Sequence, residues 1–276
     1  MPSFICETCG VGFAPSEKPP ARCPICEDPR QYVPPSGQKW TTMEGLSRRG
    51  MNAWKLVEPG LMGVGSEPKI AIGQRAMLLN TPQGNILWDC ISLLDEATVD
   101  IITALGGLSA IAISHPHYYG TMVDWSKAFG DIPIYLHADD SKWIMRPDPA
   151  IQLWQGETHQ LADGVTLIRC GGHFAGGVVL HWAGGGNGEG ALLAGDIVQV
   201  IPDRTHVSFM RSYPNLLPLS APAVARLAKA LEPFEFSTIY GAFFGRDVVD
   251  EGKDVLRRSV VRYLAAICSD GSPELE

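Results

Sequence analysis

The chain has 276 residues, of which 45% are hydrophobic, so it is long enough to bury a sizeable core as one large domain or as one domain plus a small module. Its formal net charge is -8 and it has no basic tract, which argues against nucleic acid or an anionic membrane as its main partner. The first residues, MPSFICETCG, lack the pattern of a secretion signal, and no run of about 18 apolar residues predicts a membrane span. We therefore expect a cytoplasmic protein with a small-molecule substrate. Assembly into a homo-oligomer stays open.

Four of the seven cysteines lie near the start of the chain in two Cys-x-x-Cys pairs, formed by Cys6, Cys9, Cys23 and Cys26. Each pair places two thiolates on a tight turn, so that four sulfurs can surround one metal ion. The segment FICETCGVGFAPSEKPPARCPICEDPRQYV resembles rubredoxin-like and zinc-ribbon knuckles. The sequence thus predicts a metal-binding module over residues 1–38 and a second domain over residues 39–276. Structural zinc is favoured, and iron stays open because both metals accept four thiolates.

The remaining elements follow from apolar periodicity and turn residues. After the linker VPPSGQ, the segment IAIGQRAMLLNTPQGNILWDC predicts two strands split by a turn, and DEATVDIITALGG predicts a helix. Short apolar runs predict five further strands, in SAIAIS, PIYLH, GVTLIRC, GVVLHWA and GALLAGD. SAPAVARLAKALEPF predicts a helix with Ser220 as its N-cap, STIYGAFFG a strand and loop, and EGKDVLRRSVVRYLAAI a terminal helix. Two strand-rich halves, each closed by helices, favour a sandwich.

Two histidines, His115 and His117, follow one of these strands in the stretch SHPHYYG. Strand alternation points residues i and i+2 to the same side, so both imidazoles can share one metal ion. Taken alone the pattern is weak, because a single HxH is common and either histidine could be an ordinary hydrogen-bonded residue.

The wider pattern is more specific. The ordered landmarks NTPQGNILWD, ISHPH, GGHFAGG and LLAGD resemble those of the metallo-β-lactamase superfamily over about residues 50–245. The resemblance implies an α/β fold, the αββα sandwich, with a metal site at the edge between two sheets. It implies that His115, His117 and His173 bind one zinc or iron ion, and that Asp196 is a further ligand or a neighbouring carboxylate. Three neutral imidazoles with an open position are typical of a catalytic metal that lowers the pKa of its water to ~7.

The departures from this family pattern concern the second metal ion. Tyr119 and Gly120 stand where the motif has Asp and His, and Ala242 stands where the last histidine aligns. A standard dinuclear centre is therefore not expected, and the carboxylate that orients the attacking water is missing.

Three residues are candidates for catalytic roles. Asp196 is one of them, and Asp124, one helical turn beyond the motif if TMVDWSKAF is a helix, is a second carboxylate. Tyr119, or its neighbour Tyr118, could donate a hydrogen bond to an oxyanion. The alternatives are a solvated surface carboxylate for Asp124 and a packed aromatic wall for the tyrosines. In the loop DRTHVSFMRSYPN, two arginines could clamp a carboxylate or phosphate, or could be solvated loop charges.

The favoured function is a mononuclear metallo-hydrolase that activates water against an ester, thioester, lactone or amide. A non-catalytic metal- or ligand-binding or regulatory protein with the same fold is the first alternative, because the second-metal ligands are replaced. A redox protein with rubredoxin-like iron is the second, since the two parts resemble components of flavodiiron proteins.

Overall fold

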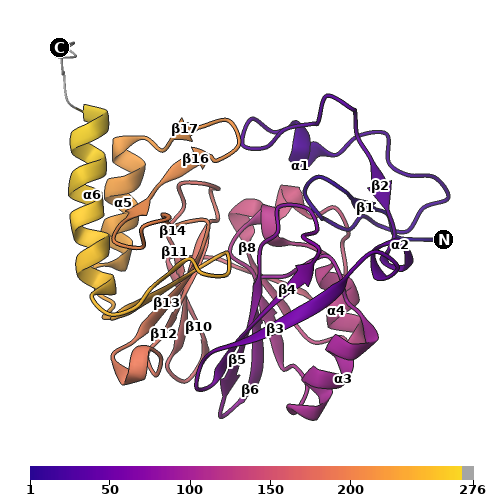
Figure 1. The fold of residues 1–276 in the computed structure, drawn as a ribbon, viewed down its shortest axis with the longest axis horizontal. Helices are drawn as coiled ribbons and strands as arrows, with labels where there is room; N and C mark the ends of the chain where they lie inside the picture. Colours follow the sequence, from indigo (N-terminus) through magenta and orange to yellow (C-terminus); the bar gives the residue numbers. More distant parts are fainter. Residues whose placement is uncertain (269–276) are drawn as a thin grey trace.

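The computed structural model describes residues 1–268, and residues 269–276, at the end of the predicted second domain, lie outside the described residues. Two β-sheets pack between two layers of helices, and the cysteine-rich N-terminal segment lies across one end of the sandwich (Figure 1). The αββα architecture implied by the family resemblance is therefore confirmed.

The first sheet has seven strands in chain order: β3 (Met51–Glu58), β4 (Leu61–Glu67), β5 (Ala76–Thr81), β6 (Gly84–Trp88), β7 (Ala110–Ala112), β8 (Ile134–His137) and β9 (Ile151–Trp154). Pairing is antiparallel from β3 to β6 and parallel from β6 to β9. Helices α3 (Glu96–Ala104) and α4 (Met122–Ala128) cover its outer face (Figure 1). The side chain of Asp95 caps α3 by accepting from the amide of Thr98, which satisfies one of the free donors at the helix start.

The second sheet has six strands, in the order β10 (Thr158–Ala162), β11 (Val165–Arg169), β12 (Val178–Trp182), β13 (Ala191–Gly195), β18 (Thr238–Gly241) and β19 (Asp247–Val248). Helices α5 (Ala221–Leu231) and α6 (Gly252–Cys268) cover it. Ser220 stands at the N-cap position of α5, as predicted, but its side chain makes no capping hydrogen bond. Two short ribbons lie between β13 and α5: β14 (Gln199–Val200) with β15 (Val207–Ser208), and β16 (Met210–Ser212) with β17 (Leu217–Pro218).

The core consists of layers of apolar side chains. Between the sheets, residues such as Leu79, Trp88, Leu180 and Leu193 are almost completely buried and form one cluster. The strands that supply them are short apolar runs buried on both faces, as expected for strands inside a layered α/β sandwich. The two sheets therefore form a rigid frame, and the loops at one end of that frame can hold side chains in fixed positions.

The cysteine-rich segment has little regular structure. It contains β1 (Ile5–Cys6), α1 (Pro24–Glu27) and β2 (Trp40–Thr41), and α2 (Met43–Ser47) follows it. β1 pairs with β2, so the last strand of this small unit lies just past the predicted boundary at residue 38. We call residues 1–41 the cysteine module. Its four paired cysteines belong to the same buried cluster as residues of β7 and α4, so the module shares a core with the sandwich.

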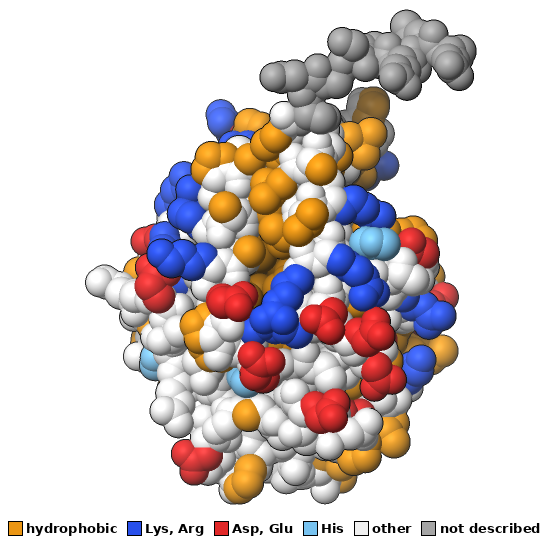
Figure 2. All heavy atoms as spheres, turned by 90° about the vertical axis from the view of Figure 1, so that its left-hand side faces the viewer, with side chains coloured by type: hydrophobic (Ala, Val, Ile, Leu, Met, Phe, Trp, Pro, Cys, Tyr) orange, Lys and Arg blue, Asp and Glu red, His pale blue; other side chains and the backbone are white. Residues whose placement is uncertain are grey.

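The outer face around α6 carries a band of hydrophobic side chains with Lys and Arg on both sides (Figure 2). Val261 is the most exposed of the large hydrophobic residues of this helix. Among the described residues, no helix combines the length and apolar character needed to cross a membrane.

Candidate metal sites and the cavity beside them

The four cysteines of the module converge as predicted. Cys6 Sγ lies 3.5 Å from Cys26 Sγ, and Cys9 Sγ lies 3.7 Å from Cys23 Sγ. Four thiolates bound to one tetrahedral ion at about 2.3 Å would be about 3.8 Å apart, so the group fits zinc or iron with little movement. All four are buried, and hydrogen bonds from the other thiols, above all Cys23, lower the pKa of Cys6 well below its usual value. The side-chain amide of Gln38 donates to Cys6 Sγ at 3.1 Å, as expected beside a thiolate.

The three predicted histidines also converge, from two different loops. His115 and His117 lie in the loop after β7, where a short 3-10 turn, η1 (Pro116–Tyr118), holds the second histidine next to the first. His173 lies in the loop between β11 and β12. The three ring centroids lie 4.9 to 5.2 Å apart, and each side chain is at most 3% exposed.

Hydrogen bonds fix which ring nitrogens face one another. Nδ1 of His115 lies 2.9 Å from the Ser114 hydroxyl, and Nδ1 of His173 lies 3.1 Å from the carbonyl oxygen of Met210. Both rings therefore present Nε2 to the centre of the group, and the buried Nε2 of His115 has no other partner. Nε2 of His173 lies 3.2 Å from Nδ1 of His117. Two imidazoles on a tetrahedral ion at about 2.0 to 2.1 Å would be about 3.3 to 3.4 Å apart, so the donor set fits one ion.

The electrostatic environment favours neutral imidazoles. Burial is the main cause that lowers the pKa of His115 and His117 well below the usual value and that of His173 to about 4. A metal binds the neutral ring, so these histidines need not lose a proton to bind it near pH 7.

Asp196 lies beside the histidines at the end of β13 and lines the same cavity, but it is not part of the group of three converging ligands. Its Oδ1 is buried without a partner, and burial raises its pKa to about 7. Tyr118 packs against the His115 ring with centroids 4.4 Å apart, and its buried hydroxyl is close enough to Asp196 for the two groups to affect each other's pKa. The role of Asp196 as a metal ligand stays a prediction.

The other two candidates for catalysis lie elsewhere. Asp124 accepts two hydrogen bonds of 2.9 Å from Arg146, and with Tyr119 it borders a separate hollow under Val11 and Gly12 of the cysteine module. Neither Asp124 nor Tyr119 lines the cavity of the histidines. The two neighbouring tyrosines point to different sides of the loop. Tyr118, the last residue of η1, packs against His115, whereas Tyr119 faces the cysteine module.

Two of the positions that lack a second-metal ligand, Gly120 and Ala242, are tightly packed against other parts of the chain. Gly120 has φ +48°, and a Cβ there would lie 2.9 Å from the carbonyl oxygen of Ile91, so a histidine does not fit this backbone. Ala242 is buried, and its carbonyl oxygen accepts from the amide of Arg75. Of the two loop arginines, Arg211 lines a different hollow and Arg204 lines neither that hollow nor the histidine cavity.

A cavity of about 180 Å³ opens beside His117 and His173. Its walls come from seven parts of the chain and consist mainly of apolar and aromatic side chains. The full lining is formed by Arg30, Gln31, Tyr32, Ile72, His117, His173, Asp196, Gln199, Tyr213, Pro214 and Phe243. A small concave site with a few polar groups is typical of a small-molecule binding site.

Comparisons with known proteins agree with this architecture. The chain is 48% identical over 272 residues to the uncharacterized protein YmaE of Bacillus subtilis (strain 168), covering 98% of each chain. The chain belongs to the YmaE family. No family model matches this YmaE-family protein. It covers nearly all of its Bacillus relative, cysteine module included.

Several solved metallo-β-lactamases resemble this structure. The DIM-1 enzyme superposes with a TM-score of 0.60 at 16% identity, over 78% of this chain and 97% of that one. FIM-1 from Pseudomonas aeruginosa, solved in a mono-zinc form, superposes with a TM-score of 0.56 at 14% identity, over 78% of this chain and 96% of that one. A metallo-β-lactamase from Pontibacter korlensis superposes with a TM-score of 0.54 at 14% identity, over 77% of this chain and 99% of that one. The YmaE-family protein therefore has the metallo-β-lactamase fold.

Several residues near the site were not singled out from the sequence of this YmaE-family protein: Arg30, Gln31, Tyr32, Ile72, Gln199 and Phe243. Arg30 of the cysteine module donates from Nη1 to the carbonyl oxygen of His173 at 3.3 Å and lies 3.9 Å over the Phe174 ring. The only local signal was the short spacing of Asp28 and Arg30, which form a two-point ion pair at 2.6 and 2.8 Å.

Proposed function

We propose that this protein is a metal-dependent hydrolase that uses one ion, held by His115, His117 and His173, to hydrolyse an ester, thioester, lactone or amide of a small molecule. The observation that carries the proposal is the convergence of three buried imidazoles, two of which, His117 and His173, line a cavity of about 180 Å³. Zinc, when bound by three imidazoles with an open position, activates water and polarises a carbonyl group.

The residues of the chain would share the remaining tasks. Ser114 and the Met210 carbonyl hold the imidazoles in the orientation that ligation needs. Asp196, with its pKa raised to about 7 by burial, would take a proton from water or orient it. The Tyr118 hydroxyl is the nearby donor for a developing oxyanion.

Metal analysis combined with turnover tests this proposal. Purified wild type should contain about two ions per chain, and a His115→Ala, His173→Ala double variant should contain about one, because the four-cysteine site remains. The wild type should hydrolyse at least one member of a panel of p-nitrophenyl esters, thioesters and lactones, and the double variant none. Equal metal content in both proteins would contradict the His site.

The replacements at Tyr119, Gly120 and Ala242 favour one other candidate, a non-catalytic binding protein of the same fold. That reading predicts a filled His site, binding of panel members, and hydrolysis no faster in the wild type than in the double variant. The same set of measurements therefore separates the two functions.

A further inference from the structure

The module segment from Arg30 to Tyr32 runs along the cavity of the histidines, although it lies far from His115 in the chain. All three of its residues line that cavity, opposite side chains contributed by the sandwich. The cysteine module is thus part of the candidate site itself.

The sandwich fixes this segment by its main chain. The Ser212 hydroxyl donates to the carbonyl oxygen of Arg30 at 3.0 Å, and Nδ2 of Asn215 donates to the carbonyl oxygens of Pro29 and Gln31 at 2.9 and 3.0 Å. Ser212 ends β16 and Asn215 lies in the turn between β16 and β17, which approaches α1 in Figure 1. Hydrogen bonds to the main chain hold the path of the segment without depending on its side chains, so the side chains are free to face the cavity.

The positive charge of Arg30 is compensated by Asp28, two residues before it in the cysteine module. The guanidinium of Arg30 forms a two-point ion pair with Asp28 and stacks on Phe174. Among the described residues that line the cavity, Arg30 is the only lysine or arginine. Tyr32, Ile72 and Phe243 form much of the remaining wall. The one positive charge of this wall is already paired with Asp28, which disfavours its use by the carboxylate or phosphate of a ligand tail.

We infer that residues 30–32 of the cysteine module form a selective wall of the site, with Tyr32 setting the size limit for a small, uncharged, apolar acyl group. Asn215 is a positioning residue for the same selectivity, because its hydrogen bonds to the carbonyl oxygens of Pro29 and Gln31 hold the main chain of residues 30–32 in place. This inference rests on the proposed function, because it assumes that the ligand reaches the ion held by the three histidines.

The test uses cobalt(II)-substituted full-length protein and a series of carboxylates: acetate, butyrate, hexanoate and benzoate. The carboxylate group binds the metal and places its tail in the cavity, and the change in the cobalt absorption bands gives each dissociation constant without any turnover. Wild type should bind the short members and discriminate against hexanoate and benzoate. Tyr32→Ala should reduce that discrimination by about tenfold, Tyr32→Phe should keep it, and Asn215→Ala should weaken it.

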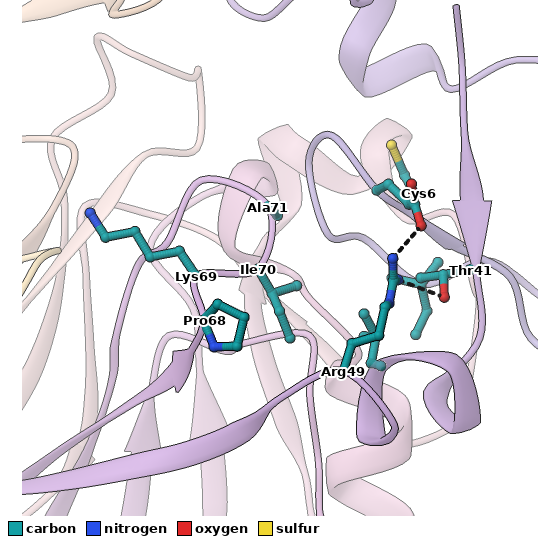
Figure 3. A pocket seen from close by; sticks show the side chains of 10 residues that line it. Cys6, Thr41, Arg49, Pro68, Lys69, Ile70 and Ala71 are labelled. Atoms are coloured by element: carbon teal, nitrogen blue, oxygen red, sulfur yellow. Dashed lines mark hydrogen bonds and ion pairs between the residues drawn. The ribbon is translucent and has the colours of Figure 1, made fainter.

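Arg49→Ala is the matched control. Arg49 also contacts the module, since it pairs with Glu7 at 3.0 Å and donates to Thr41 at 3.0 Å, but it does so in another hollow, against Pro68–Ala71 (Figure 3). This variant should discriminate among the carboxylates as the wild type does. If Tyr32→Ala and Asn215→Ala also retain the wild-type order and ratios, the wall is not selective and the inference is wrong. If wild type shows the thiolate-to-cobalt bands of the four-cysteine site and no cobalt at the His site, the proposed function fails together with the inference.

Discussion

The amide of Gly12 donates a 2.8 Å hydrogen bond to the carbonyl oxygen of Gly120, which joins the cysteine module to the loop that carries His115 and His117. Arg30 makes the corresponding contact to the other histidine loop, at the carbonyl oxygen of His173. Each loop that supplies a metal ligand thus receives a hydrogen bond from the module. Gly120, which stands where the family motif has a second-metal histidine, thus serves as a contact point for the cysteine module.

Replacing Cys9 by serine should remove the metal of the four-cysteine site and destabilise the whole fold. Cys9 is fully buried in the cluster that joins the module to β7 and α4, so losing the ion should lower the free energy of unfolding by several kcal/mol, ~3 or more. Element analysis and urea denaturation measure both effects. Cys268→Ser, at an exposed thiol, should change neither. Absorption of the fresh wild type separates the two metals, because iron thiolates absorb visible light and zinc thiolates do not.

Gly120→Ala should destabilise the protein by about 2 to 3 kcal/mol, because the residue has φ +48° and its Cβ would lie 2.9 Å from the Ile91 carbonyl oxygen. Gly107→Ala provides the comparison. Gly107 also has a positive φ, of +77°, but open space surrounds its Cβ position, so only the backbone strain of ~1 kcal/mol remains. Chemical denaturation of the two variants should separate the clash from the strain, and equal losses would show that no clash exists at Gly120.

Asp140→Asn should change how stability depends on pH. Burial raises the pKa of Asp140 from 3.8 to about 6, against the hydrogen bond that its Oδ1 accepts from the Gly176 amide and the nearby charge of Arg30. Since the folded state holds the proton more tightly than the unfolded state, the stability that this group contributes is complete below about pH 3.8 and is lost as the pH rises through about 6.

Melting temperatures from about pH 4 to pH 7 measure this effect. As the pH rises over that range, the melting temperature of the wild type should fall relative to that of Asp140→Asn. This holds for any difference in melting temperature between the two proteins at pH 4. Asp100→Asn, at an exposed carboxylate of α3, should follow the wild-type curve. Parallel curves for wild type and Asp140→Asn would show that the buried carboxyl does not titrate in this range.

The two neighbouring tyrosines should differ in their effect on turnover. Tyr118→Phe removes the hydroxyl beside Asp196 and should lower kcat for any ester that the wild type hydrolyses by roughly 10- to 100-fold, without loss of metal. Tyr119→Phe, on the module side of the loop, should leave kcat and KM unchanged. The opposite ranking would assign the donor role to Tyr119.

Much of the fold and most of the converging Cys and His side chains could be predicted from the sequence, because those signals are local. The Cys-x-x-Cys pairs and the HxH motif bring their side chains together through a turn or a strand end, and the apolar runs of β5, β6 and β11–β13 indicate buried strands. Strands β3, β4, β9 and β10 were not predicted. In β3, for example, no residue is fully buried and the apolar residues do not alternate regularly.

Only the tertiary structure decided how the cysteine module and the sandwich meet. The contacts of Arg30 with His173 and with Ser212 join residues 143 and 182 positions apart, and no local pattern of residue types encodes them. Likewise, the sequence showed that Tyr119 and Gly120 replace metal ligands, but the backbone conformation decided that Tyr118 faces Asp196 while Gly120 receives the module. Spacing along the chain therefore indicated the four cysteines, His115 and His117, and the family resemblance indicated His173, whereas the packing of loops from distant elements determined the walls of the cavity.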